Sequence, residues 1–172
     1  MKKEIVSDTG PLISLEKLDA GFNMMRDLYK EIIVPPKVME EISGGRERDY
    51  IKLYDIKDII KVQDVEHTAD LHGIGTLHDG EAQAISLAYN LGIPLLIEEL
   101  KGRKIASIAK IKFSGVAGQI VIAFKEGVIP IDKAYKNLEI MLNKNRINKV
   151  VYDALCLQID KGGLIGKSVG RN

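Results

Sequence analysis

Residues 80–100 read GEAQAISLAYNLGIPLLIEEL, and this stretch indicates how the chain folds. Apolar residues in its first half recur at helical spacing, through Ala82, Ile85, Ala88, Tyr89 and Leu91. Gly92 supplies a C-terminal stop for that helix. The apolar run at 95–97 follows at once and predicts a buried strand, which ends at two adjacent glutamates, Glu98 and Glu99.

The same alternation of strand and helix patterns extends along the chain and predicts an α/β fold with a largely parallel sheet. Strands are expected at 5–7, 31–34, 59–62, 95–97 and near 112–114. Helices are expected at 10–18, 36–43, about 46–55, 81–91, 101–110, about 117–126, and 131–158 with an interruption near 143–145. No linker divides the chain, so we expect one domain over residues 1–157. Gly162, Gly163, Gly166 and Gly170 indicate a glycine-rich tail over 158–172.

The composition is that of a globular protein, with 45% hydrophobic and 28% charged residues in 172. A net charge of +1 argues against a bulk electrostatic grip on nucleic acid and leaves room for a local basic patch. The N-terminus carries Glu4 and Asp8 before a signal-peptide core could form, and no run of about 18 apolar residues occurs. We therefore expect a cytoplasmic protein with no membrane partner. Cys156 is the single cysteine, which excludes an internal disulfide.

Five carboxylates are candidates for a site, because sites in parallel sheets form beyond the carboxyl ends of the strands. Asp8 ends the first strand, and Glu98 and Glu99 end the strand of the opening quotation. Glu41 lies on the helix after the second strand, and Glu81 lies in the first turn of the helix over 81–91. Together they predict an acidic site.

Each acid also has a structural alternative when taken alone. Asp8 could cap the following helix, and Glu81 could favour the positive end of its helix dipole. Glu41 could belong to a solvated pair with Glu40, and the two glutamates at 98–99 could form an exposed loop. Brought together, however, such acids raise one another's pKa unless a cation neutralises them. Their oxygen atoms suit Mg²⁺ or Mn²⁺, which can activate water for attack on a phosphodiester.

Four segments carry a resemblance to a known family: IVSDTGPLISLEKLD, VPPKVMEEI, DGEAQAISLAYNLGIPLLIEE and SGVAGQIVIAFKEGVIP. In order and spacing they resemble the PIN-domain superfamily, and more closely the prokaryotic PIN-like proteins related to the VapC toxins. The likeness extends from about residue 4 to about residue 157. It implies a three-layer α/β/α sandwich with a central parallel sheet, and an acidic pocket that binds Mg²⁺ or Mn²⁺ for ribonuclease activity.

The resemblance also implies roles for individual residues. The catalytic acids would be Asp8, Glu41, Glu81 and Glu99, and the metal ligands would come from Asp8, Glu81, Glu98 and Glu99. The hydroxyls of Thr9 and Ser14 match positions that often support the pocket. The family usually has aspartate at the fourth acidic position, whereas this chain has a glutamate pair that is one methylene longer. That difference leaves open either a repositioned metal site or a weakened nuclease.

Basic and histidine side chains near these acids allow two interpretations. Lys101, Arg103 and Lys104 could contact RNA phosphates, or they could form a solvated helix face that offsets the glutamates. The three histidines, His67, His72 and His78, show no metal-ligand spacing and are expected on the surface or in loops.

The leading functional hypothesis is a metal-dependent endoribonuclease, the toxin of a toxin–antitoxin pair. The resemblance implies RNA as substrate, a small antitoxin as partner and a homodimer. Two alternatives remain: a non-catalytic PIN-like protein that binds RNA or acts as a scaffold, and an RNA-maturation nuclease without a toxin role.

Overall fold

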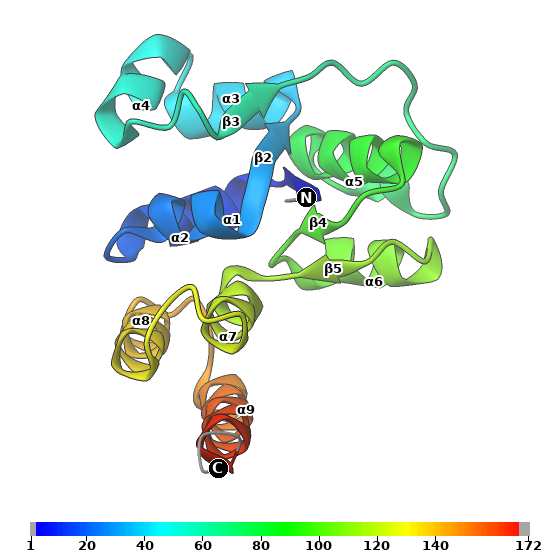
Figure 1. The fold of residues 1–172 in the computed structure, drawn as a ribbon. Coiled ribbons are helices and arrows are strands. Elements are labelled where there is room, and N and C mark those ends of the chain that lie inside the picture. The colour runs from blue at the N-terminus through cyan, green and yellow to red at the C-terminus, as the bar shows by residue number, and fades with distance from the viewer. Residues whose placement is uncertain (1–2, 169–172) are drawn as a thin grey trace.

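The computed structural model describes residues 3–168, with side chains described as far as residue 162. Its centre is one sheet of five strands in the order β3-β2-β1-β4-β5, all parallel (Figure 1). The strands are β1 (Lys3–Ser7), β2 (Tyr29–Val34), β3 (Ile60–Val62), β4 (Leu95–Leu96) and β5 (Phe113–Ser114). Each lies within one or two residues of its predicted position, so the parallel α/β prediction is confirmed.

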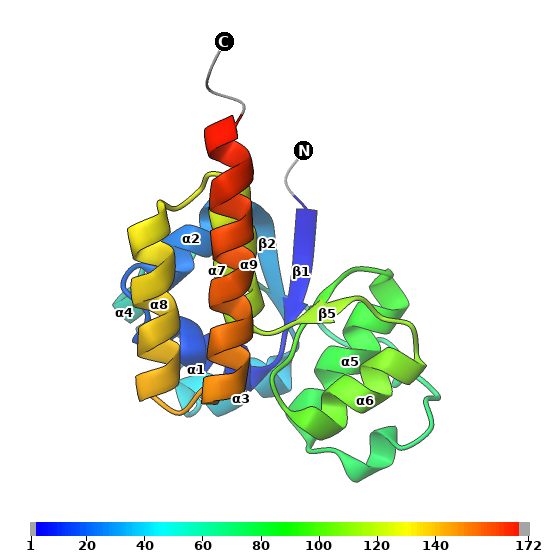
Figure 2. The same cartoon turned by 90° about the horizontal axis from the view of Figure 1, so that it is seen from below.

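Helices cover both faces of the sheet. They are α1 (Thr9–Lys17), α2 (Gly21–Leu28), α3 (Pro36–Ser43), α4 (Glu47–Tyr54), α5 (Asp79–Leu91), α6 (Leu100–Ile108), α7 (Val116–Lys125), α8 (Ile131–Asn143) and α9 (Lys149–Ser168), with a 3₁₀ turn η1 (Ile74–Thr76). Helices α5 and α6 lie on one side of the sheet, and α1 and α7 lie on the other (Figure 2). Helices α8 and α9 pack on α7 and extend its layer outward. The three-layer α/β/α prediction is therefore confirmed.

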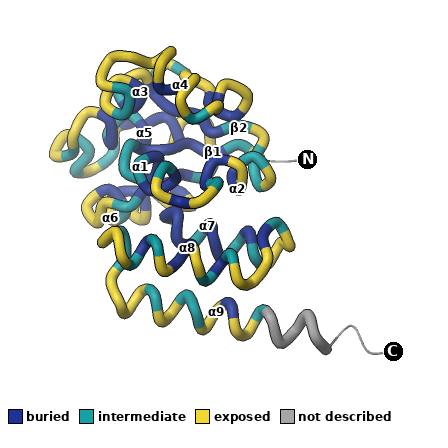
Figure 3. The backbone as a smooth tube through the Cα atoms, turned by 90° about the vertical axis from the view of Figure 1, so that its left-hand side faces the viewer, coloured by how far each residue is buried: buried dark blue, intermediate teal, exposed yellow. Residues whose placement is uncertain are grey.

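The strands that position the site are buried on both faces. Ile5, Val6 and Ser7 of β1 are all buried, as are the last three residues of β2. Continuous burial of this kind is expected where helices cover both sides of a parallel sheet. The ends of these strands are therefore held by a packed interior, while α9 is exposed along most of its described length (Figure 3).

The buried face of α5 includes only part of its apolar period. Tyr89 and Leu91 fall on the same helical period as Ile85 and Ala88, yet they are 50% and 39% exposed. Ala84 and Leu87 are buried in their place, next to the predicted Ile85 and Ala88. The helix is apolar over more than one face, so the sequence pattern alone did not fix its orientation.

The glycine-rich tail predicted from residue 158 is wrong for the residues that the structure describes. Helix α9 begins at Lys149 and continues to Ser168 across the expected boundary at 157. Ile159 is fully buried, and a Cβ on Gly162 would lie 3.2 Å from Cε1 of Phe124 in α7. Gly162 thus permits close packing between helices. Residues 169–172, which include Gly170, lie outside the described residues.

Among residues 3–168, no helix is both long enough and apolar enough to cross a lipid bilayer.

The sheet should depend strongly on side chains such as Ile33, which is 1% exposed in β2. Ile33→Ala removes three buried carbon atoms and leaves a cavity, so we expect a loss of about 2–5 kcal/mol in the free energy of unfolding. Ile131→Ala is the matched control, because Ile131 is 44% exposed, and should change stability by about 0.5 kcal/mol or less. Urea denaturation followed by circular dichroism measures both. Equal losses would contradict this description of the core.

Candidate active site

A cavity of about 540 Å³ opens at the carboxyl edge of the sheet. Four carboxylates reach it from four parts of the chain: the residue after β1, helix α3, helix α5 and the residue before α6. Its lining residues are Asp8, Thr9, Glu41, Thr76, Leu77, His78, Glu81, Glu99 and Lys101. The four acids predicted as catalytic therefore all line one cavity, which we call the acidic cavity.

Asp8 lies at the centre of the sheet edge because β1 pairs with β4. Its backbone amide donates to the carbonyl of Leu96 at 3.1 Å, beyond the last residue of β1. The residue is 5% exposed. Burial, followed by the negative charges of Glu81 and Glu41, raises the pKa of the Asp8 carboxyl to about 6, although the amides of Thr9 and Gly10 act in the opposite direction. The Asp8 side chain makes no capping hydrogen bond to α1.

Glu81 is the second buried acid and enters the cavity from the first turn of α5. It is 8% exposed, and among the described residues its Oε1 atom has no hydrogen-bond partner. Burial raises the pKa of Glu81, and the charge of Glu99 adds to that rise. The backbone near His78 and the charges of His78 and Lys101 offset part of it. A buried oxygen without a partner is costly, so this atom is available to a ligand.

Glu41 and Thr9 form a pair at the outer wall. The Thr9 hydroxyl donates to Oε2 of Glu41 at 2.6 Å. Glu41 itself is exposed, but its carboxylate lies against Gly80, where a Cβ would come within 2.6 Å of Oε2. Gly80 therefore allows the carboxylate to approach the first turn of α5, where backbone amides favour negative charge. Thr9 therefore lines the acidic cavity and holds the carboxylate of Glu41.

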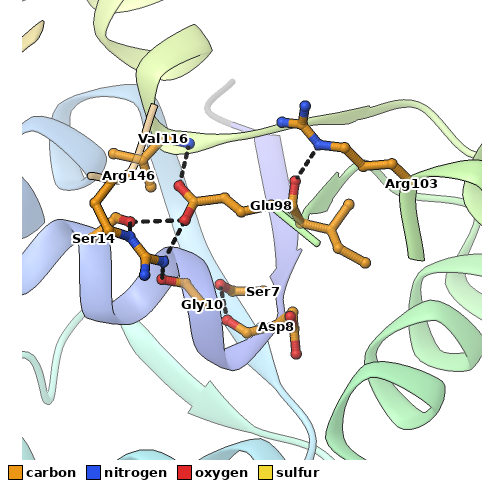
Figure 4. A network of polar contacts seen from close by, with 9 residues as sticks. Ser7, Asp8, Gly10, Ser14, Glu98, Arg103, Val116 and Arg146 are labelled. Carbon is orange, nitrogen blue, oxygen red and sulfur yellow. Dashed lines mark hydrogen bonds and ion pairs between the residues drawn. The ribbon is translucent and has the colours of Figure 1, made fainter. Parts of the chain in front are cut away.

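The two adjacent glutamates have different environments. Glu99 lines the acidic cavity, whereas Glu98 does not. The carboxylate of Glu98 accepts hydrogen bonds from the Ser14 hydroxyl at 2.8 Å, from Arg146 Nη2 at 2.6 Å and from the amide of Val116 at 3.3 Å. Figure 4 shows this carboxylate turned toward Ser14 and Arg146. Glu98 thus lies outside the cavity that holds the other predicted metal ligands, Asp8, Glu81 and Glu99. Ser14, which was predicted to support the pocket, also lies outside it.

Arg146 connects this network to the segment after Asp8. Its Nη2 atom donates to the carbonyl of Gly10 at 2.9 Å as well as to Glu98, and its Nε donates to Ser14 at 2.8 Å. Arg146 lies between α8 and α9, more than 130 positions from Gly10 in the chain. One guanidinium therefore bonds to both Gly10 and Glu98. Gly10 lies two residues after Asp8, and Glu98 directly precedes Glu99.

The three predicted phosphate contacts lie in three different places. Lys101 lines the acidic cavity, where its Nζ donates to the carbonyl of Thr76. Arg103 does not line the acidic cavity but a separate one, which Glu98 also lines. Lys104 is exposed and lines neither cavity. Only Lys101 is placed to face a group bound by the four acids.

Four residues in or beside the site are not among those predicted from the sequence. Thr76 at the end of η1, and Leu77 and His78 in the loop before α5, enter the acidic cavity. His78 is exposed and in a loop, as expected, but it stands directly before α5 and Glu81. The position of His78 just before the Asp79-Gly80-Glu81 helix start was the available signal; for Arg146 the sequence offered none.

The donor set of the cavity fits a hard divalent cation. It consists of carboxylate oxygens, which are the ligands that Mg²⁺ and Mn²⁺ prefer. The raised pKa of Asp8 and the unpartnered Oε1 of Glu81 are both features that a cation would relieve. Within residues 3–168, however, no three His, Cys, Asp or Glu side chains already converge as a metal cluster. The fit therefore rests on chemistry and burial.

Comparison with known proteins identifies the class. A model of the PIN domain matches residues 4–161, which is most of the chain, so this protein belongs to the PIN-domain family. PIN domains are generally nucleases and typically use divalent metals. A search among curated proteins finds no match for this chain.

The buried charge of Asp8 should lower stability as the pH rises in the absence of metal. The folded state holds the Asp8 proton up to a pKa of about 6, whereas the unfolded state loses it near 3.8, so the folded state binds more protons between these values. Stability therefore falls as the pH rises from about 4 to about 6 and then levels off.

Asp8→Asn removes this penalty, so the variant should become more stable than the wild type above pH 6, by up to about 3 kcal/mol. Denaturation in EDTA at pH 4, 5, 6 and 7 measures the difference between the two proteins. A difference that does not change with pH would show that the Asp8 carboxyl ionises without penalty.

The Arg146–Glu98 pair should show strong energetic coupling, because the two side chains are only 25% and 15% exposed. Arg146→Met leaves the Glu98 charge unpaired, and we expect a loss of about 1–3 kcal/mol in the free energy of unfolding. Adding Glu98→Gln to Arg146→Met should restore part of that loss. A double-mutant cycle by urea denaturation measures the coupling, and strictly additive effects would rule it out.

Proposed function

We propose that this protein is a metal-dependent endoribonuclease that hydrolyses RNA phosphodiester bonds in the acidic cavity. The observation that carries the proposal is the convergence of Asp8, Glu41, Glu81 and Glu99 on one cavity, with two of these acids buried. Membership of the PIN-domain family supports a nuclease, and RNA as the substrate follows from the resemblance to VapC-like proteins.

In this proposal the residues of the acidic cavity and its neighbours have different roles. Asp8, Glu81 and Glu99 would hold Mg²⁺ or Mn²⁺, which supplies an activated water and stabilises charge on the phosphate when bound. Glu41, held by Thr9 at 2.6 Å, lies at the more exposed wall, where it can accept a proton from water. Lys101 can place its positive charge against a phosphate oxygen once the contact with Thr76 is released. Glu98 and Arg146 position the backbone on which Asp8 and Glu99 are carried.

The toxin role is part of the same proposal and rests on the resemblance alone. It implies a small antitoxin that occupies the groove at the acidic cavity, and a homodimer as the working unit. An RNA-maturation nuclease would use the same residues without an antitoxin. A neighbouring reading frame for a small antitoxin, and copurification of its product, would separate the two.

A non-catalytic RNA-binding protein is the second candidate, and one observation favours it. Glu98 is held by Arg146, Ser14 and the Val116 amide, so the fourth acidic position of the family depends on Glu99 alone. A glutamate carries its carboxylate one methylene farther from the backbone than the usual aspartate does. If Glu99 does not complete the metal site, the fold would keep its RNA surface without chemistry.

Cleavage of a mixed RNA pool in Mg²⁺, Mn²⁺ or EDTA tests the proposal. We expect metal-dependent cleavage that falls by more than about a hundredfold in Asp8→Asn and Glu81→Gln, because even outer partners of metal ligands are typically worth about 10- to 100-fold. Glu40→Gln is the matched control: Glu40 is the exposed neighbour of Glu41, pairs with Lys37 at 3.1 Å, and does not line the cavity. It should keep nearly full activity.

A folded protein, freed of any copurifying inhibitor, that cleaves RNA with neither metal would exclude the ribonuclease and leave the binding protein. Cleavage that persists in EDTA, or equally in Asp8→Asn, would mean that a contaminating nuclease or a different site is responsible.

A further inference from the structure

A second cavity of about 430 Å³ lies beside the acidic cavity. The two cavities share no lining residue. Glu98 lines the second cavity and its chain neighbour Glu99 lines the first, so the cavities lie on either side of the backbone at residues 98–99. Six lining residues matter here: Arg103, Phe113, Arg146, Asn148, Val151 and Leu155. They come from α6, β5, the α8–α9 connection and α9.

Arg103 presents a fixed guanidinium to this second cavity. Its Nε donates to the carbonyl of Ile97 at 3.0 Å, and its Cζ lies 5.9 Å from the centre of the Phe113 ring. The absence of a side chain on Gly115 lets the guanidinium approach, since a Cβ there would lie 2.7 Å from Nη2 of Arg103. Figure 4 shows Arg103 and Arg146 on either side of Glu98.

The charge of Arg103 is not neutralised within the described part of the chain. Arg146 is paired with Glu98 at 2.6 Å, whereas no described carboxylate forms an ion pair with Arg103. The two Nη atoms of Arg103 likewise donate to no described acceptor. The second cavity therefore carries an excess positive charge and planar donors, which suit the oxygens of a phosphate.

An apolar and open wall of the second cavity adjoins Arg103. Phe113 is 37% exposed and Val151 is 40% exposed, and Leu155 lies beside them in the lining. The Oδ1 atom of Asn148 accepts from the amide of Val151 at 2.9 Å, which leaves its side-chain amide nitrogen for another partner. An accessible aromatic ring beside a cation is the combination on which unpaired bases stack.

We propose that the second cavity binds one nucleotide of a single-stranded RNA whose neighbouring phosphate lies in the acidic cavity. The phosphate of this nucleotide binds Arg103, and its base lies on Phe113 and Val151 with Asn148 at its edge. The RNA must be single-stranded, because a base that is paired within a double helix could not lie on Phe113 and Val151. This inference rests on the proposed function for the identity of the strand, but it concerns binding and needs no metal.

Binding of a fluorescein-labelled eight-nucleotide RNA in EDTA tests this subsite without cleavage. Arg103→Gln should raise Kd about tenfold and reduce the slope of log K against log salt by about 0.7–1, because one phosphate contact is lost. Phe113→Ser should raise Kd about fivefold or more through loss of stacking. Phe113→Leu should raise Kd less than Phe113→Ser does, since leucine keeps the apolar wall.

Arg48→Gln is the matched control. Arg48 is an exposed arginine in α4, it lines neither cavity, and α4 lies far from β5 (Figure 1). Its replacement should change Kd by less than about twofold. Equal effects of Arg103→Gln and Arg48→Gln would overturn the subsite and indicate a response to net charge. If Arg103→Gln fails to fold, as judged by its thermal midpoint, the two Phe113 variants decide.

The outcomes also separate this proposal from the ribonuclease. Metal-dependent cleavage with no selective effect of Arg103 or Phe113 keeps the nuclease and removes the subsite. Selective loss of binding in a protein that cleaves nothing keeps the subsite and removes the nuclease. A polyglutamate peptide that binds with Arg103 dependence, where the RNA does not, would overturn the subsite in favour of an acidic protein partner.

Discussion

The parallel pairing of β1 with β4 is the constraint on which the rest of the site depends. Because the two strands run in the same direction, their carboxyl ends meet, and the amide of Asp8 bonds to the carbonyl of Leu96. Leu96 precedes Glu98 by two positions in the chain, so this bond places Asp8 beside the segment in which Glu98 and Glu99 leave the sheet. Helices α3 and α5 then bring Glu41 and Glu81 to the same edge. Buried acids at such an edge are unfavourable for folding and useful for binding a cation.

The adjacent glutamates show how one short segment can serve two purposes. Glu99 turns into the acidic cavity, and Glu98 turns the other way to meet Arg146. Arg146 also bonds Gly10, so the C-terminal helices α8 and α9 are tied to the residues that follow Asp8. The C-terminal third of the chain is therefore part of the support of the site, even though none of its described residues adds an acid to the acidic cavity. The same turn of the backbone separates the acidic cavity from the second, basic one.

The sequence predicted the strands and four of the acids because both follow from local patterns. Short apolar runs that end at an acid mark the strand ends, and parallel strands must bring those ends together. The divergent directions of Glu98 and Glu99 could not be predicted, since they depend on Arg146, which lies 48 positions from Glu98 in the chain. Gly162 predicts part of a glycine-rich tail, but its contact with Phe124 exists only once α9 packs on α7. Long-range contacts of this kind leave no periodic signal.

The most direct test is Mn²⁺ binding, measured by calorimetry on the wild type, Glu99→Gln and Glu98→Gln. The two variants make the same chemical change at adjacent positions. We predict that Glu99→Gln lowers the Mn²⁺ affinity by about tenfold or more, whereas Glu98→Gln, with its carboxylate in the Arg146 network, changes it by less than about threefold. The reverse order, or the absence of Mn²⁺ binding by the folded wild type, would contradict the assignment of the acidic cavity as a metal site.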